Sequence, residues 1–129
     1  MKIKFLTLEV VKAIHLNQIN RYGGHHGLRD EKLLDSAINY PQVTFDKEYL
    51  HADIYHMAAS YMYAIIKNHP FIDGNKRTGL MVAILFLAYN DIFITAQDSE
   101  LYDLTMAAAQ SHIIETDLAI FFKQKTTKH

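Results

Sequence analysis

The sequence predicts an all-α fold of about six helices in a single domain. Apolar residues recur at helical spacing through most of the chain, and Thr or Asp residues that suit N-caps precede these segments. Stretches with glycine or proline separate them. Half of the 129 residues are hydrophobic and none is cysteine, so the core must form without disulfides. We expect one domain over residues 1–129, with no internal repeat.

The first helix is predicted to begin after the N-cap Thr7 and to run to about Ile19, because apolar residues repeat there at helical spacing. Its inward-facing residues are Leu8, Val11, Ile14 and, as a further candidate, Leu16. A loop over residues 20–27 should follow, since it contains three glycines.

Asp30 is the predicted N-cap of a second helix, which should end at Asn39, before Pro41. The next segment, residues 42–51, combines β-branched and aromatic side chains. It is compatible with a loop, a short hairpin or a turn of helix, and the sequence leaves these three open.

A third helix should begin after Asp53 and end near Asn68, because Pro70 disfavours helical backbone angles in the residue before it. A central helix should start in the pair Gly74-Asn75 and run to about Asn90. This helix is apolar almost all round, which is typical of a helix surrounded by other helices.

The last third of the chain predicts a short extended piece over residues 93–95 and two more helices. The candidate N-caps are Asp98 or Ser99 for the fifth helix and Thr116 or Asp117 for the sixth. These helices should end near residues 110 and 123.

Composition argues against several classes of function. The net charge is −1, without the basic surplus that broad phosphate-backbone binding needs, so we expect no direct nucleic-acid binding. The longest apolar run, Leu80 to Tyr89, is far shorter than the roughly 20 residues of a membrane helix. No signal peptide is apparent, and the lack of cysteine fits a reducing compartment. We therefore expect a cytoplasmic protein with no membrane partner.

The most informative stretch is residues 69–79, which reads His-Pro-Phe-Ile-Asp-Gly-Asn-Lys-Arg-Thr-Gly and leads into the central helix. A helix start has free backbone N–H groups and the positive end of the helix dipole, so it attracts anions. The stretch adds a base, a carboxylate and two adjacent cations. Together these groups favour a phosphate bound with Mg²⁺.

Each residue type in this stretch suits phosphate chemistry. The imidazole of His69 can act as a neutral base at cell pH and take a hydroxyl proton. Asp73 can hold Mg²⁺ through one carboxylate. The pair Gly74-Asn75 tolerates unusual backbone angles, so that N–H groups can converge on a phosphate. The pair Lys76-Arg77 adds a point charge and a planar fork. Phe71 should point inward and anchor the loop.

Each feature alone also has a simpler explanation. A histidine before proline is usually a surface turn residue, Asp-Gly-Asn is a common turn, and Lys-Arg is a common solvated pair. Their joint occurrence before a buried helix favours a functional loop. Arg21, ahead of Tyr-Gly-Gly, is open between a structural loop residue and a contact to the site. The histidine pairs 25/26 and 51/56 lack a recognised zinc-ligand spacing.

This stretch resembles the signature of the Fic/Doc family, H-x-F-x-[D/E]-[G/A]-N-x-R, at all of its fixed positions. The resemblance extends to residues 21–24, to Pro41 and to the alanine-rich helix before the motif. It implies a Fic/Doc-type bundle whose motif loop opens a central buried helix, with ATP and Mg²⁺ as cofactors. It implies catalytic roles for His69, Asp73, Lys76 and Arg77, with the metal at Asp73. The nucleotide-binding residues that it implies are Phe71, Gly74, Asn75, Lys76, Arg77 and Arg21.

Two positions depart from the adenylylating Fic pattern. Lys76 stands where those enzymes carry glycine, and Leu80 stands where they carry a second arginine. Doc-type members carry the lysine and are understood to bind ATP in the reversed sense and transfer its γ-phosphate. The resemblance therefore favours phosphoryl transfer, with AMP transfer as the alternative.

The resemblance further implies a Doc-like toxin that phosphorylates elongation factor Tu and arrests translation. Two stretches, residues 44–49 and 111–116, come near the inhibitory pattern [S/T]-x-x-x-E-[G/N] of some Fic proteins but fail at its last position, despite Glu48 and Glu115. Restraint should then come from a cognate antitoxin whose disordered tail folds on the toxin. A further alternative is a catalytically idle binding or co-repressor module.

Overall fold

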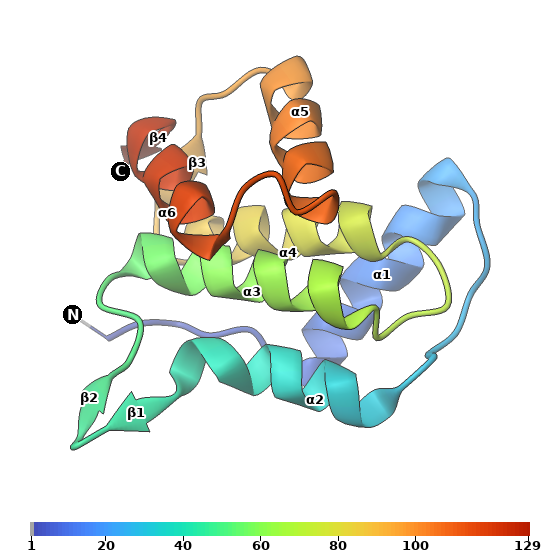
Figure 1. The fold of residues 1–129 in the computed structure, drawn as a ribbon, viewed down its shortest axis with the longest axis horizontal. Coiled ribbons are helices and arrows are strands. Elements are labelled where there is room, and N and C mark those ends of the chain that lie inside the picture. Colours follow the sequence, from blue (N-terminus) through green and yellow to red (C-terminus); the bar gives the residue numbers. More distant parts are fainter. Residues whose placement is uncertain (1) are drawn as a thin grey trace.

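A computed structural model describes residues 2–129 and confirms the all-α fold, with six helices in this range (Figure 1). The helices are α1 (Leu8–Tyr22), α2 (Glu31–Asn39), α3 (Ile54–Asn68), α4 (Asn75–Tyr89), α5 (Asp98–Ala109) and α6 (Glu115–Gln124). Two small antiparallel strand pairs join β1 (Thr44–Phe45) with β2 (Glu48–Tyr49) and β3 (Ile92–Ile94) with β4 (Thr126–Lys128). A 3₁₀ turn, Tyr40–Gln42, follows α2.

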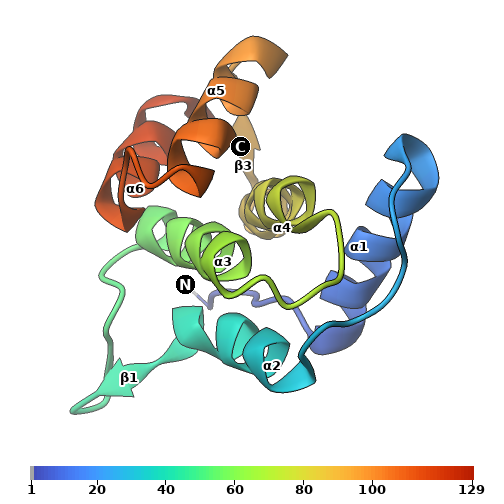
Figure 2. The same ribbon diagram turned by 45° about the vertical axis from the view of Figure 1, so that its right-hand side comes forward.

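Helices α3 and α4 form the centre of the domain, as the apolar sequence of the central helix predicts. They run antiparallel and are joined by a short loop, while α6 packs on α3 and both α1 and α5 flank α4 (Figures 1 and 2). The buried rings of Tyr61 on α3 and Phe86 on α4 lie 5.1 Å apart. The Tyr61 hydroxyl accepts the N–H of Leu6 at 3.1 Å, and burial raises the pKa of this tyrosine to about 12.

The three N-caps predicted in the first half of the chain are confirmed. Thr7, Asp30 and Asp53 each accept a backbone N–H three residues further on, from Val10, Leu33 and His56. The distances are 3.3, 3.1 and 2.8 Å. These bonds satisfy donors that a helix cannot satisfy by itself. The helix ends predicted at Asn39 and Asn68 are also confirmed.

The N-caps predicted in the second half are wrong. Gln97 precedes α5, so Asp98 and Ser99 are its first residues, and Ile114 precedes α6, which places Thr116 and Asp117 inside that helix. In both helices a carboxylate reaches back from the first turn. Glu100 accepts the N–H of Gln97 at 3.1 Å, and Asp117 accepts that of Ile114 at 2.9 Å. In a capping box the third helical residue accepts the N–H of the N-cap residue in this way. The bond fixes the helix start even though no small polar residue stands at the cap.

Helix α1 is longer than predicted and reaches Tyr22. Arg21 therefore lies in its last turn and not in a loop. Val11 is fully buried, but the further candidate Leu16 is 51% exposed, so its inward orientation is wrong. Three residues of the following segment have left-handed backbone angles: Gly23, Gly24 and Gly27.

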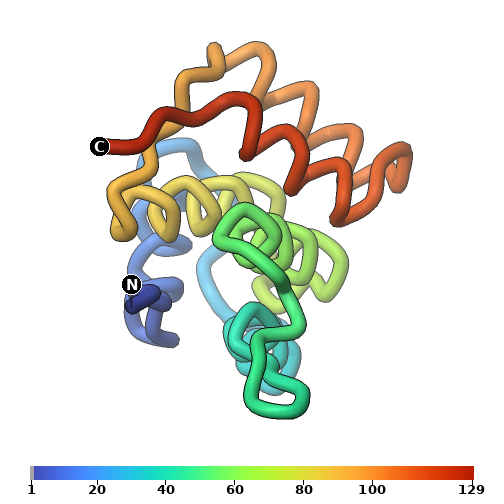
Figure 3. Tube along the Cα trace, turned by 90° about the vertical axis from the view of Figure 1, so that its left-hand side faces the viewer, coloured from blue at the N-terminus to red at the C-terminus, as the bar shows by residue number. Residues whose placement is uncertain are grey.

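Of the three structures compatible with residues 42–51, the segment forms a short hairpin. Asp46 and Lys47, with φ of 52° and 68°, make its two-residue turn, as tight hairpins require. The hairpin projects from the helical body (Figure 3), and Phe45 on it is 78% exposed. The extended piece predicted at 93–95 is β3, whose partner β4 was not predicted.

Both ends of the described chain meet at the turn after α4. Lys4 and Asn90 exchange two hydrogen bonds, with the Lys4 N–H donating at 2.9 Å and its carbonyl accepting at 3.0 Å. The N–H of His129 donates to the carbonyl of Asp91 at 2.9 Å. Within residues 2–129 no helix combines the length and apolar character needed to cross a bilayer.

Candidate active site

The loop of residues 69–74 connects the two central helices and contains the head of the predicted motif. His69 ends α3 in a left-handed conformation, with φ 48° and ψ 54°. Gly74 starts α4 with φ 76°, and no side chain caps this helix. The N–H groups of the first turn of α4 are therefore open to an outside ligand, and the helix dipole favours an anion there.

Asn75 and Phe71 hold the loop in shape. The Asn75 amide accepts the N–H of Phe71 and donates to its carbonyl, both at 3.0 Å. Phe71 is 2% exposed, so it anchors the loop as predicted. Its ring stacks on the imidazole of His15 from α1, with centroids 3.8 Å apart and planes 5° apart. Both motif residues thus have internal partners, and their predicted contact with a nucleotide stays a prediction.

His15 is a part of the site that the sequence did not reveal. Its Nε2 lies 2.8 Å from the carbonyl oxygen of Asp73, and because a carbonyl only accepts, Nε2 carries the proton. Burial lowers the pKa of His15, and the electrostatic effects of nearby His26 and Arg77 lower it further. The ring is therefore neutral near pH 7 and fixes the backbone of the carboxylate residue.

Asp73 presents an ionised carboxylate beside the helix start. Oδ2 accepts the N–H of His25 at 3.1 Å and Oδ1 accepts that of Gly74 at 2.8 Å. These two backbone hydrogen bonds, that of His25 first, lower the pKa of Asp73. Each oxygen keeps a lone pair for a cation, and one carboxylate together with substrate phosphates is the usual protein contribution to a Mg²⁺ site. The donor set fits Mg²⁺.

His69 is exposed at the head of the loop that contains this carboxylate, and its ring has no hydrogen-bond partner among residues 2–129. Lys76 is also exposed and Arg77 is half-buried. The guanidinium of Arg77 donates to the carbonyl of Gly23 at 2.9 Å and lies 5.7 Å from the ring centroid of Tyr22. Arg21 lies 5.8 Å from the centroid of the same ring, and no hydrogen bond or ion pair joins it to the motif within residues 2–129. The motif residues share one loop and helix start, and Arg21 and Arg77 both approach Tyr22.

The segment of residues 23–30 lies along the motif and contacts it at several points. Gly27 accepts the N–H of Ile72 at 3.0 Å, and Leu28 forms an isolated β-bridge with Phe71. Arg29 binds carbonyls of the motif with its backbone and its side chain. A Cβ on Gly24 would lie 2.7 Å from Oδ2 of Asp73, so glycine is required for this close approach. The loop can be predicted from the sequence, whereas its contacts with residues 23–30 depend on the fold.

A groove of about 620 Å³ opens beside the motif and is lined by residues of α1, α4 and α5. Lys76, Arg77 and Leu80 line it from α4. Its other walls include Tyr22, Leu101, Tyr102 and Met106. The two positions that depart from the adenylylating pattern, Lys76 and Leu80, thus face the same space.

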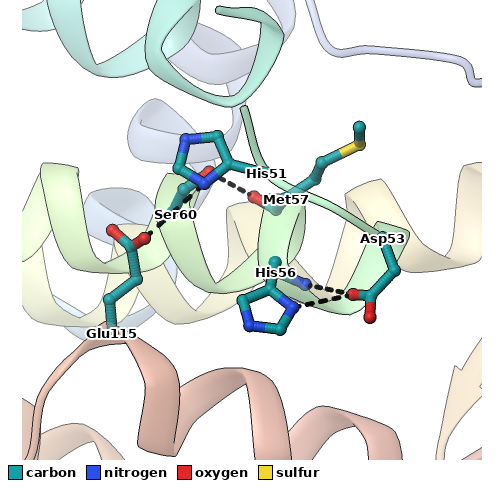
Figure 4. Close-up of polar contacts among 6 residues, drawn as sticks. All are labelled: His51, Asp53, His56, Met57, Ser60 and Glu115. Carbon is teal, nitrogen blue, oxygen red and sulfur yellow. Dashed lines mark hydrogen bonds and ion pairs between the residues drawn. The ribbon is translucent and has the colours of Figure 1, made fainter. Parts of the chain in front are cut away.

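The two near-inhibitory glutamates lie away from the motif. Glu115 at the start of α6 approaches Nδ1 of the buried His51 at 3.6 Å, beside Ser60 on α3 (Figure 4). Ser60 lies nine residues before His69, the C-cap of α3, so the His51–Glu115 pair lies roughly 13 Å along the helix from His69. Glu48 is exposed on the hairpin. His56 pairs with Asp53 instead, at 3.0 Å, so the two histidines serve separate carboxylates (Figure 4).

Comparison with known proteins identifies the family of the chain. A model described as the Fic/DOC family matches residues 5–87, which include the whole motif. The chain belongs to the Fic/DOC family. A phage relative, the protein kinase doc of Escherichia phage P1, is 33% identical over 117 residues, which is 91% of each chain. A bacterial member, the toxin Doc of Mycolicibacterium smegmatis, is 35% identical over 75 residues, or 58% of each chain.

Proposed function

We propose that this Fic/DOC member is a Doc-like toxin that transfers the γ-phosphate of ATP to a serine or threonine hydroxyl of a translation factor in the cytoplasm. Elongation factor Tu is the proposed acceptor, with translation arrest as the consequence. The printed names of the two relatives, a protein kinase and a toxin, support the class of activity. The observation that carries the proposal is one short loop that holds the exposed His69 imidazole, the ionised carboxylate of Asp73 and an uncapped helix start.

The residues divide the chemistry among them. His69 takes the proton of the acceptor hydroxyl, because its ring is exposed and free of internal partners. The first turn of α4 and the Arg77 guanidinium bind phosphate oxygens. Asp73 would hold Mg²⁺, which when bound neutralises phosphate charge. Transfer then depends on position and charge, and this chain supplies both.

Lys76 supports phosphoryl transfer over AMP transfer. Its exposed ammonium lines the groove beside Arg77 and can neutralise a migrating phosphoryl group. Leu80, one turn further along α4 on the same wall of the groove, is apolar where adenylylating enzymes carry a second cation. The competing function is AMP transfer with the nucleotide in the opposite sense.

Labelled nucleotide separates these functions. Purified protein, Mg²⁺ and elongation factor Tu are incubated with ATP labelled on the γ-phosphate or on the α-phosphate. We expect label from the γ position only, and a loss of about 10²–10⁴-fold in rate for His69→Ala, the cost of removing a general base. Lys76→Gly should also transfer poorly. Label from the α position alone would replace the proposal with AMP transfer.

The partner proposed for this toxin is an antitoxin whose tail folds into the groove beside the motif. A second groove of about 410 Å³ lies between α1 and α4 and shares Gln18 and Met81 with the first. Both grooves are lined mainly by apolar side chains, and the first also contains Lys76 and Arg77. This lining suits an amphipathic helix laid along α1 and α4.

A further inference from the structure

Arg29 holds three successive carbonyls at the end of α3. Its Nε donates to the carbonyl of His69 at 2.6 Å and its Nη2 to that of Asn68 at 2.7 Å. Its backbone N–H donates to the carbonyl of Pro70 at 2.8 Å. The residue is exposed, yet its head group is fixed to the backbone of the proposed base.

These bonds suit the chemistry of a helix C-terminus. The last carbonyls of a helix lack internal partners and carry the negative end of the dipole, so a cation is favourable there. A guanidinium presents parallel N–H groups in a rigid plane, and its charge strengthens both bonds. A lysine ammonium cannot reproduce this planar fork.

The need for such support lies in the conformation of His69. This residue has φ 48°, a left-handed conformation that residues other than glycine adopt at a cost and only where surrounding structure imposes it. Its N–H donates to Ile65 at 3.2 Å, and Arg29 is the partner of its carbonyl. The conformation of the backbone sets the direction in which the exposed imidazole leaves the loop.

We propose that Arg29 is a positioning residue for His69, holding the base in the left-handed conformation from which it reaches the acceptor hydroxyl. This inference rests on the proposed role of His69 as a base. Arg29 acts through the backbone and not on the nucleotide. Its loss should therefore lower kcat and leave the KM for ATP unchanged, because a displaced base slows the chemical step only.

The test uses the full chain as wild type, Arg29→Ala, Arg29→Lys and the control Lys32→Ala. Lys32 is an exposed cation on α2 with no hydrogen bond or ion pair among residues 2–129. Amide hydrogen exchange at His69 is followed by NMR, and γ-phosphate transfer to elongation factor Tu is measured in parallel. Arg29→Ala and Arg29→Lys should speed exchange at His69 and lower kcat about 10–100-fold with the KM for ATP within twofold. Lys32→Ala should match wild type.

Chemical rescue adds a readout that a general loss of structure would not show. Guanidinium chloride, far below denaturing concentrations, should restore slow exchange and transfer in Arg29→Ala, while equimolar urea, which is planar but uncharged, should not. Unchanged exchange at His69 in Arg29→Ala would overturn the inference, as would a raised KM for ATP at constant kcat. If the wild type transfers neither phosphate nor AMP, the proposed function fails, and the exchange measurement still decides whether Arg29 fixes the backbone of His69.

Discussion

Asp73 shows how backbone hydrogen bonds keep a single carboxylate ionised. Two backbone N–H groups fix its oxygens and lower its pKa, so it remains ionised well below neutral pH. Asp73→Asn keeps the shape and the turn but removes the charge. We expect wild type to bind ATP more tightly with Mg²⁺ than without, and the variant to lose this difference, as measured by calorimetric titration. Equal binding by wild type with and without Mg²⁺ would contradict a metal at this residue.

His15 makes stability depend on pH. Its folded pKa is lowered by burial, so the unfolded chain binds more protons than the folded one. The contribution of His15 to the free energy of unfolding is therefore complete above its ordinary pKa of about 6.5. It is lost as the pH falls through the lower pKa of the folded state. His15→Gln should lose less stability than wild type between pH 7 and pH 5, measured by urea unfolding at each pH. Identical losses would show that His15 titrates normally.

For single residues, the sequence predicts the motif well, but it does not predict the residues that hold the motif in place. Residues 69–77 are contiguous, so their order alone indicates a base, a carboxylate and an anion-binding helix start. His15 and Arg29 reach the motif across 58 and 40 positions of sequence, through contacts that only the fold creates. A histidine inside an amphipathic helix and an arginine before an N-cap carry no local signal of these roles.

Among the elements, the segment of residues 23–30 constrains the site most directly. Gly24 has φ 119°, and a Cβ there would collide with Oδ2 of Asp73 at 2.7 Å. Gly24→Ala should therefore displace the carboxylate and weaken Mg²⁺-dependent ATP binding. Gly23→Ala is the matched control, since its φ of 86° is also left-handed but a Cβ would meet nothing within 4 Å. Both should cost stability by about 1–3 kcal/mol from backbone strain.

Comparing these two glycine variants separates backbone strain from the contact with Asp73. Thermal unfolding gives the shared cost of strain, and titration of Mg²⁺ with ATP gives the specific effect of Gly24→Ala. If both variants bind ATP and Mg²⁺ as wild type does, the contact with Asp73 is not what requires glycine at position 24.

The ends of helices and strands can be predicted from the sequence only where a local residue marks them. Helices α2 and α3 could be placed from the sequence, because Asp30, Asp53 and Pro70 mark their ends locally. The starts of α5 and α6 could not, since Gln97 and Ile114 are weak capping residues and the reciprocal carboxylates lie inside the helices. Strand β4 pairs with β3 across more than 30 residues, and its own sequence does not distinguish it from a helix end.

For the whole molecule, the position of Glu115 bears on how activity is restrained. It faces His51 and lies roughly two and a half helical turns from His69. We expect wild type to arrest growth when it is expressed without a partner gene, and Glu48→Gln and Glu115→Gln to be no more harmful. Colony counts after induction measure this, with His69→Ala as the inactive control. A harmless wild type beside a lethal Glu115→Gln would place the inhibitor within the chain.

The turn after α4 has a topological consequence. Because Lys4 bonds to Asn90 and His129 to Asp91, residues 4 and 129 lie on the same side of the domain (Figure 1). A short flexible linker should join them, and new ends can be opened at Asp46-Lys47, the exposed hairpin turn opposite the motif. This circular permutant should retain the helical circular dichroism and ATP binding of the parent. Loss of both would show that the order of the helices along the chain, and not only their packing, is needed to form the domain.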